Sequence, residues 1–141
     1  MDVNSKESGN GDQDIEQLRY MQNAYAEQYE LLGNEITTLS MAINTVRKDI
    51  DLIDNMERVE NSTVLFNSQG NIYMNANVGK VDSVIVYVGA NYLIEKSLDE
   101  AGSFLKGNLE KQEAGLKKLI SERQKIEKEL FDISYKLSSM Q

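Results

Sequence analysis

A hydrophobic repeat that keeps one spacing from Ile15 to Ile53 constrains the fold of this chain more than any other feature. Its members lie alternately three and four residues apart, and all but Gln22 are apolar or aromatic: Ile15, Leu18, Gln22, Tyr25, Tyr29, Leu32, Ile36, Leu39, Ile43, Val46, Ile50 and Ile53. This spacing is typical of the seam along which one long helix packs against another. It predicts a coiled-coil helix over residues 15–58 that begins near Asp14.

A second seam of the same kind occupies residues 98–140. Ser97 and Glu100 have the spacing of a capping box, so they predict where this helix begins. The seam positions are Leu98, Gly102, Leu105, Leu109, Gln112, Leu116, Leu119, Arg123, Ile126, Leu130, Ile133, Leu137 and Met140, and only Gly102, Gln112 and Arg123 interrupt its apolar character. A connector that reverses the chain would lay the two helices antiparallel, with both chain ends at the same end of the pair.

The connector, residues 61–96, is rich in β-branched and aromatic residues with turn residues between them. It predicts two β-hairpins, with turns near Gly70, where glycine can adopt a positive φ, and at residues 89–91. The segment 83–88 is apolar on both faces, which predicts a strand covered on both sides. The strand positions expected to mediate assembly are Val64, Leu65, Phe66, Ile72, Met74, Val84, Ile85, Val86, Tyr87, Val88, Tyr92 and Ile94.

The fold class that follows is mainly α with a small β block, an antiparallel coiled-coil hairpin of helices joined by two β-hairpins. Isolated hairpins are marginal in water, and their edges carry unpaired N–H and C=O groups. Strands from several subunits are therefore expected to complete a barrel on oligomerisation. Residues 15–141 form a single domain in this interpretation, and residues 1–14 form a flexible polar tail that lacks the pattern of a signal peptide.

Composition argues against several classes of function. The net charge is −8, whereas a nucleic-acid-binding protein normally presents a basic face. The apolar run Val84–Ile94 is too short to span a membrane. The chain contains no histidine or cysteine, and no phosphate-binding loop or nucleophile motif is present. We therefore expect no catalytic site, no metal and no cofactor.

The segment 81–101 resembles the second hairpin and second-helix start of prefoldin α subunits, and the two seams and the first hairpin match that family in kind. Two departures concern turn and edge detail: Leu65 and Phe66 stand where relatives often carry proline, and Ala90 stands where a second glycine is common. The matching motif residues are Gly89, Tyr92, Glu95, Lys96, Glu100 and Ala101. Two hairpins favour the α class, because β-class members have one.

The resemblance implies a function as well as a fold. It implies a cytoplasmic hetero-hexamer of this α-type chain with prefoldin β-type subunits, two α and four β, around a double β-barrel. Such a complex holds unfolded client proteins at the tips of its coiled coils without ATP and delivers them to a group II chaperonin. The alternative is a structural coiled-coil scaffold or adaptor that assembles through its β-hairpins and has no holdase activity.

The tips in this interpretation are residues 12–28 and 126–141. Their apolar seam side chains either close the helix pair or bind clients: Ile15, Leu18, Tyr25, Ile126, Leu130, Ile133, Leu137 and Met140. Four large side chains lie off the seam, namely Tyr20, Met21, Phe131 and Tyr135. Phe131 and Tyr135 are four residues apart on one side of the helix, where they either bind clients or pack laterally. Exposed aromatic and methionine side chains suit partners of varied shape.

Overall fold

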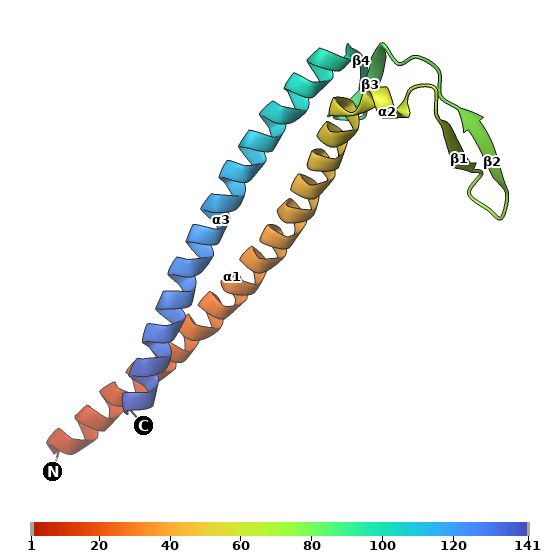
Figure 1. The fold of residues 1–141 in the computed structure, drawn as a ribbon. Coiled ribbons are helices and arrows are strands. Elements are labelled where there is room, and N and C mark those ends of the chain that lie inside the picture. Colours follow the sequence, from red (N-terminus) through yellow and green to blue (C-terminus); the bar gives the residue numbers. More distant parts are fainter. Residues whose placement is uncertain (1, 141) are drawn as a thin grey trace. The chain divides into compact units, whose positions relative to one another are not determined.

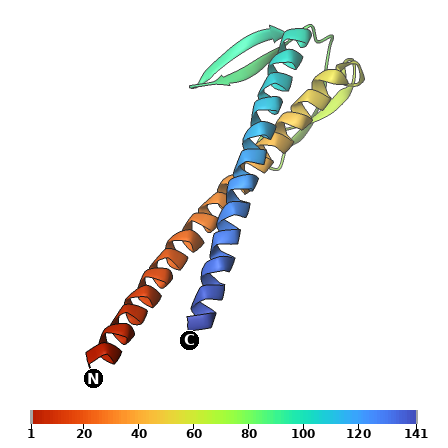
Figure 2. The ribbon, with the colours of Figure 1, turned by 90° about the vertical axis from the view of Figure 1, so that its left-hand side faces the viewer.

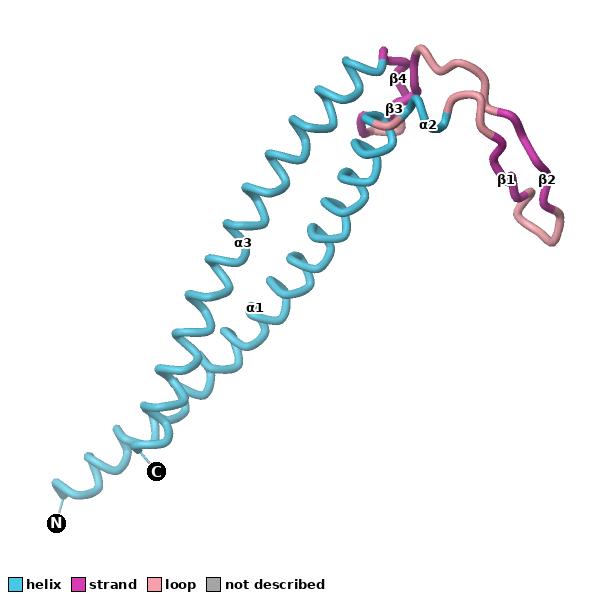
Figure 3. Tube along the Cα trace, in the orientation of Figure 1, coloured by secondary structure: helices cyan, strands magenta, loops and turns pink. Residues whose placement is uncertain are grey.

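The structure is a computed structural model that describes residues 2–140, with side chains from residue 9 onward. Two long helices, α1 (Asp2–Asp54) and α3 (Leu98–Met140), flank a short helix α2 (Met56–Val59) and four strands in sequence. The strands are β1 (Thr63–Asn67), β2 (Tyr73–Asn77), β3 (Ser83–Gly89) and β4 (Tyr92–Ser97). Figures 1 and 3 show this order along the chain, which confirms the predicted fold class.

Helix α1 differs from the prediction at both ends. The helix begins at Asp2, so the predicted start near Asp14 lies inside it. No proline interrupts the segment, although Gly9 and Gly11 each cost about 1 kcal/mol of helix propensity relative to alanine. At the other end α1 stops at Asp54 rather than near Arg58, and Arg58 lies in the separate helix α2. The break falls at Asn55, where φ is −112° and ψ is 26°.

The chain divides into two compact units, and α1 and α3 each contribute a segment to both. We call Met1–Met41 with Glu113–Gln141 the helical unit. Within it the two helix segments run side by side in opposite directions, as Figures 1 and 2 show. Its buried side chains are all members of the predicted seams: Leu32, Ile126, Ile133 and Leu137. The seam prediction is therefore confirmed for this unit.

The second unit, Ala42–Gln112, contains the ends of both helices, α2 and all four strands, and we call it the hairpin unit. Its buried side chains are Ile43, Met56, Ala101 and Leu105. The predicted capping box is confirmed at the start of α3. The Glu100 backbone N–H donates to Ser97 Oγ at 3.2 Å, and the Ser97 N–H donates to Glu100 Oε2 at 3.4 Å.

The strands form two separate antiparallel pairs, β1 with β2 and β3 with β4. In the first turn the positive φ falls on Gln69, at 66°, and not on Gly70 as predicted. Asn67 Oδ1 instead accepts a hydrogen bond from the Gly70 N–H at 3.2 Å, which closes the turn through a side chain. In the second turn the two central residues, Ala90 and Asn91, have positive φ, at 48° and 63°, as a two-residue hairpin turn requires. Gly89, with φ at 102°, lies at the register shift that follows Tyr87.

In the single chain strand β3 is covered on one face only, so the predicted cover on its second face is not supplied by this chain itself. Val84, Val86 and Val88 are half-buried. Ile85 and Tyr87 point to the other face and are 70% and 60% exposed. A continuous apolar run suggested two covered faces, but a two-stranded sheet in a single chain has only one helical layer to pack against.

Candidate functional site

Three aromatic side chains of the helical unit stand in solvent near the chain ends. Tyr20 on α1 is 75% exposed, and Phe131 and Tyr135 on α3 are 71% and 70% exposed. Phe131 and Tyr135 share a helix face that points away from the buried Ile133 and Leu137. Aromatic side chains that the fold leaves in solvent are candidates for contact with another protein.

The remaining predicted tip residues lie in or beside the seam. Ile133 and Leu137 are buried between α1 and α3 within the helical unit, so they close the helix pair. Met140, the last described residue, is 40% exposed. The other predicted tip side chains are half-buried: Ile15, Leu18, Met21, Tyr25 and Leu130. The structure therefore divides the predicted tip residues into side chains that are buried or half-buried in or beside the seam and side chains that are exposed to solvent.

The β3–β4 hairpin presents an apolar outer face. Ile85 pairs in register with Glu95, and Tyr87 pairs with Leu93. Leu93 is 66% exposed on this face beside Ile85 and Tyr87, although sequence reasoning did not select it. The β-register of the hairpin could have identified it, because residues paired across two strands share a face. On the inner face, Lys96 Nζ lies 5.4 Å from the centroid of the Phe104 ring.

Both faces of the β1–β2 hairpin are exposed over the full length of both strands. The register aligns Val64 with Ala76 and Phe66 with Met74, so these four side chains form one apolar face. Leu65 lies on the opposite face across from Asn75. The predicted assembly positions that the structure leaves exposed are Val64, Leu65, Phe66, Ile72, Met74, Ile85, Tyr87, Tyr92 and Ile94.

A cleft of about 720 Å³ in the hairpin unit runs along β3, over the ends of α1 and α3. Four successive β3 residues, 84–87, border it, while no β4 residue does. Its walls are mainly apolar, with Leu52 from α1 and Phe104 from α3. Gln112 also lines this cleft, and its Oε1 atom is buried without a hydrogen-bond donor. Such an orphaned acceptor costs about 1–3 kcal/mol.

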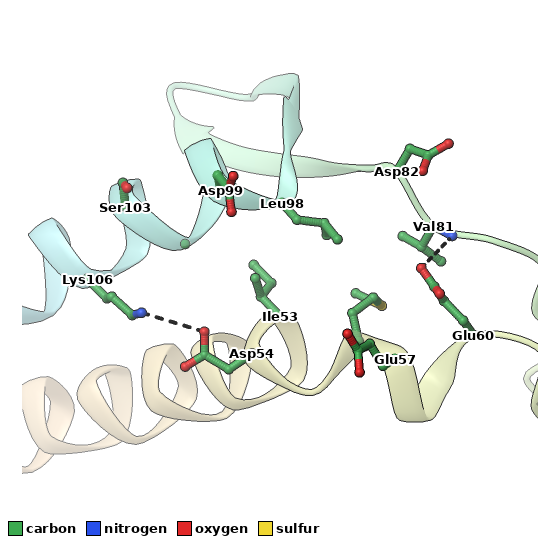
Figure 4. A pocket seen from close by; sticks show the side chains of 12 residues that line it. Ile53, Asp54, Glu57, Glu60, Val81, Asp82, Leu98, Asp99, Ser103 and Lys106 are labelled. Atoms are coloured by element: carbon green, nitrogen blue, oxygen red, sulfur yellow. Dashed lines mark hydrogen bonds and ion pairs between the residues drawn. The ribbon is translucent and has the colours of Figure 1, made fainter.

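A second hollow of about 700 Å³, in the same unit, is polar and already organised by contacts within the chain (Figure 4). Glu60 Oε1 accepts a hydrogen bond from the Val81 backbone N–H at 3.1 Å, which ties the β2–β3 connection to the end of α2. Lys106 Nζ lies 3.6 Å from Asp54 Oδ1, an exposed ion pair that contributes little to stability. This hollow therefore serves the local fold.

Among residues 9–140, whose side chains the structure describes, there is no cluster of three or more residues able to hold a metal ion. No helix within residues 2–140 combines the length and the apolar character needed to cross a bilayer. What the chain presents is exposed apolar surface on the strands and near the helix ends. The fold and these surfaces define a class of protein, an assembly subunit made of an antiparallel helix pair with two unpartnered β-hairpins.

Comparison with known proteins agrees with this class. The family model described as "Prefoldin subunit" matches residues 25–141, and the chain belongs to the prefoldin family. The prefoldin subunit alpha of Pyrococcus horikoshii is 26% identical over 131 residues, which cover 91% of this chain and 88% of that protein. The prefoldin subunit alpha of Thermofilum pendens is 31% identical over 112 residues, 79% and 84% of the two chains.

A solved structure supports the same assignment. A chain of the cryo-EM structure of filamentous PFD from Methanocaldococcus jannaschii superposes with a TM-score of 0.53 and 27% identity. The match covers 86% of this chain and 96% of that one. Prefoldin is a chaperone family and not an enzyme family, and membership supports oligomeric assembly of this chain with other prefoldin subunits. The resemblance inferred from residues 81–101 is thereby confirmed.

Proposed function

We propose that this chain is the α-type subunit of a chaperone that holds unfolded proteins without ATP and delivers them to a group II chaperonin in the cytoplasm. In this proposal two copies assemble with four prefoldin β-type subunits, and the β-hairpins of all six complete a double β-barrel. Clients bind at the helix ends of the helical unit. The presence of two hairpins and the resemblance to proteins named prefoldin subunit alpha support the α-type assignment.

One observation supports client capture most directly: Tyr20, Phe131 and Tyr135 remain at least 70% exposed near the chain ends, although the seam beside them is closed. A side chain whose only role was to join the two helices would be buried between them. When an unfolded chain covers large aromatic groups that stood in solvent, the free energy of the system falls, and this favours binding. Because clients differ in sequence, a surface without fixed polar partners suits this task.

The test is an aggregation assay with the assembled complex and a chemically denatured client. We expect the complex of this chain with its β-type partner to suppress aggregation in the absence of nucleotide. Removing residues 1–25 and 128–141 should abolish suppression while assembly persists, because the hairpin unit contains none of those residues. Intact suppression by the shortened complex would show that the helix ends do not hold clients.

The same assay decides the alternative function. If the full-length complex assembles but never suppresses aggregation, the chain is a structural scaffold that uses its hairpins only for assembly. The exposed apolar side chains away from the chain ends favour that alternative, since they could pack against a lateral partner: Leu31, Met41 and Ile120.

The cleft along β3 supports assembly through the hairpins. Strand β3 pairs only with β4, so its other edge is open to a strand from another subunit. A strand docked there would place apolar side chains against Leu52 and Phe104, and it could carry the donor that Gln112 Oε1 lacks. In this proposal the cleft is the part of the assembly surface that a partner subunit fills.

The substitution Gln112→Leu should therefore have opposite effects on the chain and on the complex. In the isolated chain it removes a buried unpaired acceptor, and we expect the free energy of unfolding to rise by about 1 kcal/mol. In the complex it removes a hydrogen bond, and we expect affinity for the β-type partner to fall about tenfold. Urea unfolding measures the first effect and a titration with the partner measures the second. Unchanged affinity would mean that no partner donor reaches Gln112.

A further inference from the structure

Apolar packing along the regular first seam does not by itself fix the axial alignment of α1 and α3. A strict heptad repeat remains a repeat when one helix slides past the other by seven residues, because each apolar position is replaced by another. The seam from Ile15 to Ile53 is of this kind. A slide of one heptad would move the end of one helix by about 10 Å along the other. Some other feature must select a single alignment.

Arg123, one of the three interruptions of the α3 seam, makes two contacts with Tyr29 of α1 and lies close to Gly33. Its Nε donates a hydrogen bond to the backbone carbonyl oxygen of Tyr29 at 3.3 Å. Its Cζ lies 4.0 Å from the centroid of the Tyr29 ring, a cation–π contact. Its Nη2 would lie only 2.7 Å from a Cβ placed at Gly33, so the absence of a side chain there makes room for the guanidinium.

No neighbouring alignment reproduces this site. Seven residues along α1 in either direction, the positions of Tyr29 and Gly33 are taken by Ile36 and Ser40 or by Gln22 and Ala26. Neither pair offers an aromatic ring, and both place a Cβ in the space that the guanidinium needs. Gly33 is the only glycine of α1 after Gly11. A half-buried charge without partners is unfavourable, so a shifted alignment would be penalised at Arg123.

The glycine of α3 that faces the α1 seam within the helical unit, Gly115, does not supply the same discrimination. A Cβ at Gly115 would lie 3.7 Å from Leu39 Cδ2, which is an ordinary packing distance. Any leucine or isoleucine of the α1 seam could occupy that position equally well. The Gln22–Ser134 hydrogen bond, 3.1 Å long, is exposed and therefore weak. If one helix slid along the other, Arg123 would lose both a hydrogen bond and a cation–π contact, which is more than the single exposed hydrogen bond between Gln22 and Ser134.

We propose that Arg123, seated on Tyr29 and Gly33, is a positioning residue that fixes the axial alignment of α1 and α3 in the helical unit. It thereby determines which outward side chains of the two helices stand at the same level near the chain ends. A single polar side chain such as asparagine or lysine in an apolar seam is a known means of specifying alignment at some expense of stability, and Arg123 would act in the same way. The proposal concerns helix pairing and stands whether or not the helix ends hold clients.

Cysteine cross-linking tests this proposal, because the full-length chain has no cysteine of its own. The pair Gln22→Cys with Ser134→Cys reports the observed alignment, since these side chains are in contact. The pair Gln22→Cys with Glu127→Cys reports an alignment shifted by one heptad. The assembled complex is treated briefly with a short bismaleimide, and the ratio of the first product to the second is measured.

We expect Arg123→Leu and Gly33→Ala each to lower this ratio about fivefold or more, as the loss of a partly desolvated cation–π contact implies. Gly33→Ala favours helix formation and Arg123→Leu is nearly neutral for it, so circular dichroism should show unchanged or greater helicity. Gly107→Ala is the matched control, because a Cβ there meets no atom within 4 Å. Its ratio should equal that of the parent. If both Arg123→Leu and Gly33→Ala keep the parent ratio, Arg123 does not set the alignment.

Discussion

Replacing Phe131 and Tyr135 together by alanine is expected to remove most of the holding activity of the assembled complex. Both side chains are exposed, at 71% and 70%, and lie four residues apart on one face of α3. Each aromatic ring can bury roughly 150–250 Å² against a bound chain. Loss of two such contacts should weaken client binding by about tenfold or more. The concentration of complex that halves aggregation of a denatured client should rise accordingly.

The fold should tolerate this double substitution. Neither side chain packs in the seam, so the free energy of unfolding should change by less than about 1 kcal/mol. Leu31→Ala is the matched control, because Leu31 is 57% exposed on α1 but farther from the chain ends. The Leu31 variant should hold clients as well as the parent does. Equal loss in both variants would indicate that any exposed apolar group serves, and no loss in either would place client binding elsewhere.

The helices were predictable from sequence because their signal is repeated many times. Each seam position adds to a periodic pattern, and the buried Leu32, Ile126, Ile133 and Leu137 all belong to it. Helix ends carry a signal only where a cap marks them. Ser97 and Glu100 located the start of α3 correctly, whereas the capping signal read at Asp14 misplaced the start of α1, which begins at Asp2.

The surfaces were less predictable, since exposure depends on what the rest of the chain covers. The valines and aromatic residues of β3 have the composition of a buried strand, yet Ile85 and Tyr87 face solvent in the single chain. Sequence could identify Gln112 and Arg123 only as interruptions of a seam. Their environments distinguish them: Arg123 meets a ring and a glycine, while Gln112 Oε1 meets no donor. Those environments depend on helix pairing, which the spacing of residues does not specify.

Aspartate at both Ile85 and Tyr87 is expected to abolish assembly with the β-type partner. These side chains are 70% and 60% exposed on the outer face of β3, so the isolated chain should remain folded. In a completed barrel they would be covered by strands of a neighbouring subunit. Burying two unpaired carboxylates costs several kcal/mol, which should weaken association by about a thousandfold or more. Sedimentation velocity of the mixed subunits measures the loss.

The control for the β3 variant has the same number of added negative charges, placed on α1 and not on β3. Aspartate at both Leu31 and Met41, exposed at 57% and 67% on α1, adds two negative charges outside the hairpin unit. That variant should assemble as the parent does, which separates an interface effect from general repulsion in an already acidic chain. If the β3 variant assembled normally, the outer face of this hairpin would lie outside the barrel. The open edge of β3 and the cleft beside it would then have to carry assembly without that face.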